Sequence, residues 1–312
     1  MKLSFIVAMV GVCLTPALSS AQAVKLQLKY TPGEKFVVAT EETMEQKLSL
    51  PALGQDTDTR LSLSKSVLVT TGQPSEKGEI ARTHTVQNVK NDMLMPGGIR
   101  VRFDSAKPGE TKAPPFPGGA EMVDAMQTSA KAKRVYNYDS ARKLISAKVV
   151  GVDVKKLPMG MQAQFEPKLL LKTRLEQLKV LPTKEVSPGE SWMVNSEMAI
   201  GAGQVIKIKS KFTYKGPATR ADKQYDYIES EVQDITLEMS GSGPGGLRIT
   251  ESNVKPVNST GKIWFDRTAG RIAASESRMQ MKGTLTMSVN DRPTDGKIDF
   301  IVTSKAEVKP AK

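Results

Sequence analysis

The sequence predicts a mainly β protein made of two tandem, related antiparallel β-sheet units, with one central amphipathic helix and a weaker second helix. Three observations predict this fold: stretches in which apolar and polar residues alternate, an ordered internal repeat, and one segment whose leucines have helical spacing. Alternation places one side of a strand on a core and the other side in water, as in antiparallel sheets. The two units either form separate sheets or share one continuous curved sheet.

Residues 1–23 have the features of a secretory signal peptide. A basic start precedes the apolar run Leu3–Leu14, which is too short to span a bilayer, and small residues follow it. We expect cleavage after Ala21 or Ala23. The only cysteine, Cys13, lies inside this segment, so the exported chain contains no disulfide. We therefore expect a periplasmic or extracellular protein that has no transmembrane segment after signal removal.

Alternating segments and turn clusters follow one another along the rest of the chain. The alternating segments predicted as strands are Lys25–Tyr30, Leu61–Ser64, Ile99–Phe103, Val205–Lys209, Gly283–Val289 and Lys297–Val302. The clusters rich in Gly, Pro and Asp that predict turns are Thr71–Ser75, Pro96–Gly98 and Asp291–Gly296. Together they indicate strands joined by short connections.

Two segments depart from the alternating pattern. Between Glu166 and Leu181, leucines recur at helical spacing, at positions 171, 175, 178 and 181, while basic residues including Arg174 fall on other faces. Proline in the first turn and Pro182 just after the end bracket this amphipathic helix, whose leucines we expect in the core. A weaker helical pattern covers Ala120–Lys131.

The internal repeat consists of four matches that occur in the same order in both halves. The matched pairs are Pro32–Val38 with Pro188–Val194, Gly72 with Gly216, Val86–Val89 and Met93 with Val232–Ile235 and Met239, and Tyr138–Asp139 and Lys143–Leu144 with Phe265–Asp266 and Arg271–Ile272. Collinear matches of this kind indicate a tandem duplication. The shared Pro-Gly pairs predict tight turns, and the shared aromatic-Asp pairs predict strand ends at hairpins.

The repeat suggests a division of the chain. We expect a first β unit at 24–155, a helical connection at 156–183, a second β unit at 184–304 and a disordered tail at 305–312.

At three sets of residues the chain resembles exported bacterial proteins grouped as domain of unknown function 6263. The matching stretches, besides the signal peptide, are Lys29–Glu34, Leu181–Pro182 followed by Val186–Trp192, and Gly261–Asp266 followed by Gly270–Ile272. The resemblance covers most of the mature chain, through short motifs. It implies a β-rich exported fold that has no assigned activity, and it offers no catalytic residue to carry over.

Candidate catalytic and metal-binding residues are few. His84 is the only histidine and lies in a strand-like run, so it cannot form a multi-histidine metal site. Ser62 and Lys65 have the serine-x-x-lysine spacing of penicillin-recognising enzymes, but that motif requires a helix and this stretch alternates as a strand. The turn glutamates Glu34 and Glu190 are expected to be solvated rather than paired as catalytic carboxylates.

Two polar loops complete the candidates. Gly241–Gly246 is rich in glycine but lacks the Lys-Ser/Thr of a phosphate-binding loop, so a flexible connection is expected. Asp56–Asp58 is expected in a polar turn and lacks a full set of calcium ligands. We therefore assign no catalytic, cofactor-binding or metal-ligating residue and expect no cofactor.

The formal net charge of +12 is spread over the sequence without a dense basic run or interleaved aromatics, which argues against a nucleic-acid partner. Large sheet surfaces with little catalytic equipment favour a non-enzymatic binding module of the cell envelope or extracellular space. Its expected ligand is apolar or anionic. The alternative is a structural or assembly component of the envelope that acts through protein-protein contacts.

Overall fold

The computed structural model describes residues 22–51, 54–157, 162, 165–201, 204–239, 248–289 and 292–311. In these ranges the strands belong to one antiparallel sheet of 13 strands. The strands are β1 Lys35–Leu50, β2 Gln55–Thr71, β3 Ile80–Leu94, β4 Arg100–Asp104, β5 Lys133–Tyr138, β6 Leu144–Val150, β7 Ser191–Gly201, β8 Gln204–Arg220, β9 Lys223–Met239, β10 Arg248–Pro256, β11 Thr260–Asp266, β12 Arg271–Val289 and β13 Arg292–Pro310. The helices are α1 Gly119–Lys131 and α3 Pro167–Leu178, with 3-10 turns η2 Pro96–Gly98, η3 Pro108–Glu110 and η4 Val154–Lys156. The predicted mainly β fold with two helices is confirmed.

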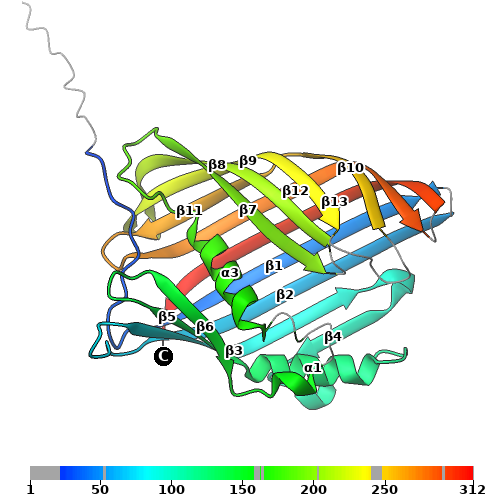
Figure 1. Ribbon diagram of the computed structural model, residues 1–312, viewed down its shortest axis with the longest axis horizontal. Coiled ribbons are helices and arrows are strands. Elements are labelled where there is room, and N and C mark those ends of the chain that lie inside the picture. Colours follow the sequence, from blue (N-terminus) through cyan, green and yellow to red (C-terminus); the bar gives the residue numbers. More distant parts are fainter. Residues whose placement is uncertain are drawn as a thin grey trace, which may run out of the picture.

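The strand order shows two related units within one sheet. It runs β6-β5-β3-β2-β1-β13-β12-β11-β9-β8-β7, with β4 paired to β3 and β10 paired to β12. The strands before β13 and those after it repeat one arrangement, and β13 joins the two units by pairing with both β1 and β12. The sheet is therefore continuous. It is also curved, because β7, β8 and β9 arch over the central strands, and α3 lies on the concave side (Figure 1).

The Pro-Gly corners that begin the two units have the same geometry. In the first corner the Gly33 amide donates to the Thr71 carbonyl at 2.9 Å, and in the second the Gly189 amide donates to the Tyr214 carbonyl at 2.7 Å. Both glycines adopt a positive φ, of 76° and 92°, which side chains disfavour. The following aromatic residues, Phe36 and Trp192, then start equivalent strands.

The repeat extends to the irregularities of the sheet. The pairing of β3 with β2 shifts so that Gln87 is an extra residue, and the pairing of β9 with β8 shifts so that Gln233 is extra. Both glutamines occupy the same place in the matched Val86–Val89 and Val232–Ile235 stretches. Because a bulge fixes the register of its neighbours, these two positions allow the inward residues of the two units to be compared one by one.

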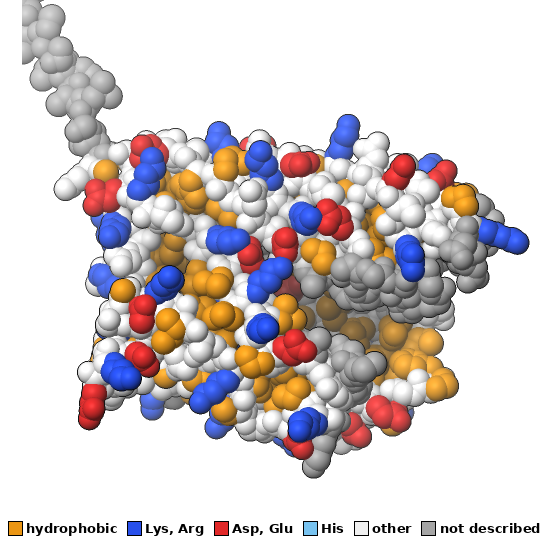
Figure 2. Space-filling view, viewed as in Figure 1, with side chains coloured by type: hydrophobic (Ala, Val, Ile, Leu, Met, Phe, Trp, Pro, Cys, Tyr) orange, Lys and Arg blue, Asp and Glu red, His pale blue; other side chains and the backbone are white. Residues whose placement is uncertain are grey.

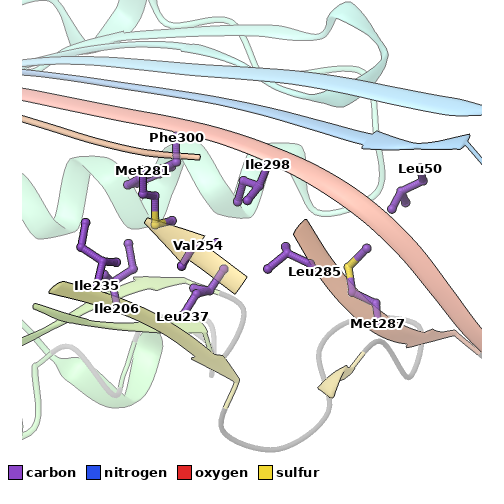
Figure 3. Close-up of a cluster of buried hydrophobic side chains, with 10 residues drawn as sticks. All are labelled: Leu50, Ile206, Ile235, Leu237, Val254, Met281, Leu285, Met287, Ile298 and Phe300. Atoms are coloured by element: carbon purple, nitrogen blue, oxygen red, sulfur yellow. The ribbon is translucent and has the colours of Figure 1, made fainter. Parts of the chain in front are cut away.

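Buried side chains from distant strands meet on the concave side. The largest cluster joins β8 and β9 to β12 and β13 and comprises Leu50, Ile206, Ile235, Leu237, Val254, Met281, Leu285, Met287, Ile298 and Phe300 (Figure 3). A second cluster packs Leu26 against the second unit, around Ile228 and Phe265. A third packs Tyr30 and Leu170 against the first unit, around Tyr138.

The helix α3 covers the concave face with a stripe that differs from the predicted one. Leu170 is buried and Leu178 is partly buried, but Leu175 is 41 % exposed. Arg174, expected on a polar face, turns inward, where its Nε donates to the Tyr138 hydroxyl at 3.3 Å. The leucine spacing predicted the helix correctly but misplaced its buried face, because the position between Leu170 and Leu178 is filled by an arginine.

Four other sequence expectations are corrected. Lys25–Tyr30 is an extended segment outside the named strands, held by the Val24–Val186 bridge and by the Lys29 amide, which donates to the Gly270 carbonyl. Asp56–Asp58 lies in β2 and not in a turn. The turn expected at Asp291–Gly296 is largely strand, since β13 begins at Arg292.

The tail expected to be disordered at 305–312 is also ordered through Pro310, because β13 continues and pairs with β1 from Phe36 onward. The other expected domain boundaries stay a prediction. The signal peptide through Ala21 and the Gly241–Gly246 loop lie outside the described residues.

Candidate ligand-binding site

A groove of about 950 Å³ crosses the sheet at mid-strand on its outer face, since its lining pairs outward neighbours such as Glu41 with Thr43 and Thr303 with Lys305. Short stretches of β4, β3, β2, β1, β13, β12 and β11 line it, and residues of η3 lie at its rim. Alternation along β1 and β13 puts Glu42 and Ser304 on the same face as Met44 and Val302, which pack against the largest core cluster. On the concave side, opposite the groove, the space-filling view shows a recess with hydrophobic side chains at its base (Figure 2).

One row of small side chains runs across the inward face behind this groove. Ser304, Ser277 and Gly261 lie in register on β13, β12 and β11, so three neighbouring strands present little bulk along one row. On the other side of Ser304 the row continues through Glu42 to Leu63. Because burial raises the pKa of the Glu42 carboxyl, its charged form is disfavoured there. The groove on the outer face is lined mainly by polar and charged residues, among which Leu63 and Phe103 are the apolar ones.

A second cavity, of about 170 Å³, lies between the sheet and α3. Its apolar wall includes Phe36, Val38 and Val69 from the sheet and Leu178 and Leu181 from the helical segment. Val38 and Glu42 are on the same face of β1, four residues apart, which is about 13 Å along a strand. The second cavity thus lies on the concave face, and the mid-strand groove lies on the opposite face.

Basic side chains gather around this second cavity. Arg82 and His84 from β3 and Arg174 from α3 line it directly. Lys65 on β2 pairs in register with Val89 and Thr40, and Arg134 on β5 pairs with His84. We call Lys65, Arg82, His84, Arg134 and Arg174 the inner basic cluster. Its members come from β2, β3, β5 and α3.

The inner basic cluster is strongly desolvated. Burial, reinforced by the charges of Arg174, Arg82, Arg134 and Lys65, lowers the pKa of His84 well below its usual range, so the imidazole is neutral. Burial and then Arg134 lower the pKa of Lys65 to about 8. Burial also lowers the pKa of Arg82, which is only 4 % exposed. Each shift shows that positive charge in this place is energetically disfavoured.

The cluster also lacks partners that would offset this cost. In the described part of the chain, the Arg82 Nε and the His84 Nε2 are buried without a hydrogen bond. Arg82 instead contacts aromatic faces, with its guanidinium carbon 4.9 Å from the Tyr30 ring centre and 5.2 Å from that of Phe36. Within the same residues, none of Lys65, Arg82 and Arg134 forms an ion pair with a carboxylate. The nearby Glu34 is paired with Arg271.

A buried charge in the second unit shows the opposite arrangement. Asp226 is 3 % exposed, accepts a hydrogen bond from the Tyr214 hydroxyl at 2.7 Å and accepts one from the Arg267 Nε at 2.8 Å. This carboxylate is fully partnered, as buried charges normally are. The inner basic cluster departs from that rule.

The equivalent positions of the second unit are neutral. Counted from the Gln87 and Gln233 bulges, Arg82 corresponds to Ile228 and His84 to Ser230. Lys65 faces Val89 as Ile208 faces Ile235, so Lys65 corresponds to Ile208. Arg134 pairs in register with His84, and Gly261 pairs in register with Ser230, so Arg134 corresponds to Gly261. The same scaffold is therefore built without charge at these places in the other half.

The sequence candidates fall in different places. Ser62 and Lys65 lie on β2 with opposite faces, so the predicted strand is confirmed and the serine does not reach the lysine. Glu34 pairs with Arg271, and Glu190 accepts a hydrogen bond from the Ser187 amide at its own corner. His84, treated as a lone strand histidine, faces the cavity beneath α3. The other members of the inner basic cluster were not recognised from the sequence as site residues.

The alternation of apolar and polar residues along β2 contains a signal for Lys65. Leu61, Leu63, Val67 and Val69 mark one face of β2, and Lys65 falls in the middle of that apolar row. A single charge in phase with buried residues is a stronger indication of a site than a charge on the polar face.

Two further structural searches concern the described residues only. No helix among them combines the length and apolar character needed to cross a membrane. No three His, Cys, Asp or Glu side chains among them are grouped to hold a metal ion.

Comparisons with known proteins give little likeness. No family model and no curated protein matches the chain. A lipovitellin structure, described for its lipid-protein interactions, aligns with a TM-score of 0.42 and 10 % identity, over 91 % of this chain and 26 % of the lipovitellin chain. The protein thus spans about a quarter of that chain.

Two smaller structures align over similar lengths. A Vibrio parahaemolyticus domain named for outer membrane lipoprotein sorting aligns with a TM-score of 0.12 and 9 % identity, over 89 % of this chain and 86 % of its own. A DUF1329 family protein from Desulfovibrio piger aligns with a TM-score of 0.12 and 11 % identity, over 85 % and 83 % of the two chains. Likeness at this level carries no conclusion about function.

Proposed function

We propose that the protein is a non-enzymatic binding module that holds a molecule with an apolar body in the hollow of its concave sheet face. The observation that carries this proposal is the cavity of about 170 Å³ between the concave face and α3. Its wall combines apolar side chains, such as Phe36, Val38 and Leu178, with a few charged groups that can orient a ligand. The signal-like start of the sequence supports a role in the envelope or outside the cell.

The geometry favours binding over a purely structural role for this face. A sheet that serves only as a scaffold gains stability by filling its concave side with bulky residues, since interiors are close-packed. Here a cavity remains between Val38 on the sheet and Leu178 on α3, while Met44 and Val302 further along the strands pack on the core. An occupant with apolar surface would complete this packing.

The test is displacement of a polarity-sensitive apolar dye, together with mass spectrometry of molecules extracted from the protein purified from its own host. We expect the wild type to bind the dye and Ala306→Phe, which fills the cavity, to weaken binding by about tenfold, equivalent to about 1.4 kcal/mol. Lys305→Phe is the matched control, because the adjacent side chain is exposed, points to the opposite face and does not line this cavity. Absence of dye binding by the wild type, or equal binding by Ala306→Phe, would refute the proposal.

The assembly role has one supporting observation. Leu175 on α3 and Met193 on the edge strand β7 are 41 % and 48 % exposed and line the same surface groove. Paired apolar side chains of this kind at a sheet edge are suited to a protein contact. Crosslinking in the native cell through a photoreactive residue at position 193 tests this role, which requires a specific partner protein to be captured.

A further inference from the structure

The inner basic cluster is the feature of the molecule that the proposed apolar site does not explain. It brings three arginines, a lysine and a neutral histidine to the α3 end of the hollow. Isolated buried charge is costly, by several kcal/mol per ion even after relaxation. Native proteins normally offset that cost with a carboxylate or a hydrogen-bond network, as Asp226 illustrates in the second unit.

The fold itself does not require this charge. Ile228, at the position equivalent to Arg82, is fully buried in an apolar cluster, and Ile208, equivalent to Lys65, packs against the largest core cluster. An isoleucine at either position of the first unit would therefore suit the same backbone. Two desolvated cations, Lys65 and Arg82, retained where the other half uses isoleucine, point to a requirement outside folding.

The missing element has a definite chemistry. The Arg82 Nε and the His84 Nε2 are buried, unpartnered and on neighbouring inward positions of β3. Arginine presents donors that match the oxygens of a carboxylate or a phosphate. A neutral imidazole can offer one N–H donor to the same anion. The surrounding wall of Phe36, Val38 and Leu178 is apolar, so the anion would be attached to an apolar body.

We infer that the protein binds anionic amphiphiles, with a carboxylate or phosphate head at the inner basic cluster beneath α3 and the adjoining apolar part against the apolar wall of the same cavity. This inference rests on the proposed function and specifies its ligand class. Arg82 and His84 line this cavity together with Phe36, Val38 and Leu178, which places charged and apolar groups around one space. The distribution of charge sets the orientation of the ligand.

The test compares three probes that share one long alkyl chain: the fatty acid, the alkyl phosphate and the primary alcohol. Affinities are measured by dye displacement for the full chain. We expect the wild type to bind at least one of the two anionic probes at least about tenfold more tightly than the alcohol, since charge-assisted hydrogen bonds in desolvated sites exceed neutral ones by this order. The ratio between the acid and the phosphate identifies the preferred head.

Two variants take the residue found at the equivalent position of the other unit. We expect Arg82→Ile, and independently Lys65→Ile, to weaken binding of the preferred anionic probe by about tenfold or more and to leave the alcohol within about twofold. Lys209→Gln, which removes an exposed charge from the outer face of β8, is the matched control and should change neither affinity. Using two variants on different strands keeps the test valid if one of them folds poorly.

The outcomes separate the two proposals. Equal binding of acid, phosphate and alcohol by the wild type, or unchanged anion binding by both variants, would overturn the inference and leave the proposed apolar site standing. Failure of all three probes, the alcohol included, to bind the wild type would overturn the proposed function as well. Loss of anion binding in Lys209→Gln as large as in Arg82→Ile would attribute the preference to overall charge and overturn the assigned site.

Discussion

The two units share strand order, corners and bulges, but their inward faces carry different residues. In the first unit, inward positions of β2, β3 and β5 hold Lys65, Arg82 and Arg134. In the second unit, the equivalent positions hold Ile208, Ile228 and Gly261. Since the backbone pairing is the same, the difference separates what the fold needs from what is added to it. The second unit shows the scaffold, and the first shows a modified copy.

The two units also treat buried charge differently. Asp226, at the position equivalent to Ile80, is neutralised by Arg267 and by the Tyr214 hydroxyl. Arg82 contacts two aromatic rings and has a buried Nε without a hydrogen bond among the described residues. A buried charge contributes to stability only together with its hydrogen-bond and ion-pair partners. A buried charge that lacks such partners lowers the stability of the protein until a ligand supplies them. This contrast gives the two halves opposite mutational behaviour.

The largest effect is expected for Asp226→Ile, which gives the second unit the residue of the first. The substitution removes the acceptor of the buried Tyr214 hydroxyl and of Arg267. We expect the free energy of unfolding to fall by about 2 to 4 kcal/mol, because hydrogen bonds to charged groups are lost and a buried hydroxyl is left unpaired. Urea denaturation measures this loss. A change below about 1 kcal/mol would mean that Asp226 is not a stabilising centre and would weaken the contrast between the units.

The next effect concerns the pH dependence set by Lys65. Its pKa in the folded protein is lowered to about 8 by burial and then by Arg134, whereas an unfolded lysine titrates near 10.4. Between these values the unfolded state binds more protons, so the free energy of unfolding rises with pH. The charged groups facing Lys65 are Arg134, Arg82, Arg174 and, on β1, Glu42, together with the neutral His84.

The measurement compares the wild type with Lys65→Met at several pH values by urea denaturation. Relative to the variant, we expect the wild type to gain about 2 kcal/mol between about pH 8 and pH 9.5, at 1.36 kcal/mol per pH unit. The comparison with Lys65→Met removes contributions from the other groups that both proteins share. Parallel pH profiles of the two proteins would show that Lys65 stays protonated in the hollow.

A smaller effect is expected for the stability of Arg82→Ile without ligand. The variant loses two cation–π contacts, worth about 0.5 to 2 kcal/mol each, and is relieved of a desolvation cost of several kcal/mol. We therefore expect the free energy of unfolding to rise by about 1 kcal/mol. A fall of more than about 1 kcal/mol would show that Arg82 is part of the scaffold and that the equivalence with Ile228 has been misread.

Much of the fold follows from local patterns in the sequence. Strict alternation located β2, β8, β12 and β13, and helical leucine spacing located α3. The matched Pro-Gly corners and the Val86–Val89 and Val232–Ile235 stretches identified the repeat. The sequence did not decide whether the two units share one sheet. The units are joined by the pairing of β13 with β1, strands near opposite ends of the chain, and no local pattern encodes so distant a partner.

The errors have similar physical causes. The residues 305–310 resemble a polar tail, yet they are ordered because β1 supplies hydrogen-bond partners from the other end of the chain. Arg174 was predicted to face solvent because the leucine spacing alone was used to assign the faces of the helix. Its Nε in fact donates a hydrogen bond to the hydroxyl of Tyr138, which lies on β5. The inner basic cluster was missed for the same reason, since its members come from separate strands and one helix and meet only in the folded protein.

The smallest effect tests the similarity of the units at their corners. Gly33→Ala and Gly189→Ala each force a residue with a Cβ into positive φ, and neither added Cβ would meet an atom closer than 3.7 Å. Only the backbone cost remains, so we expect equal losses of about 1 kcal/mol in the free energy of unfolding. Gly109→Ala in η3 is the control, because Gly109 lacks a positive φ and its Cβ would lie in open space; it should cost nothing. Losses that differ by more than about 1 kcal/mol would show that the two corners support their units unequally, and the residue-by-residue comparison of the inward faces would then lose its common frame.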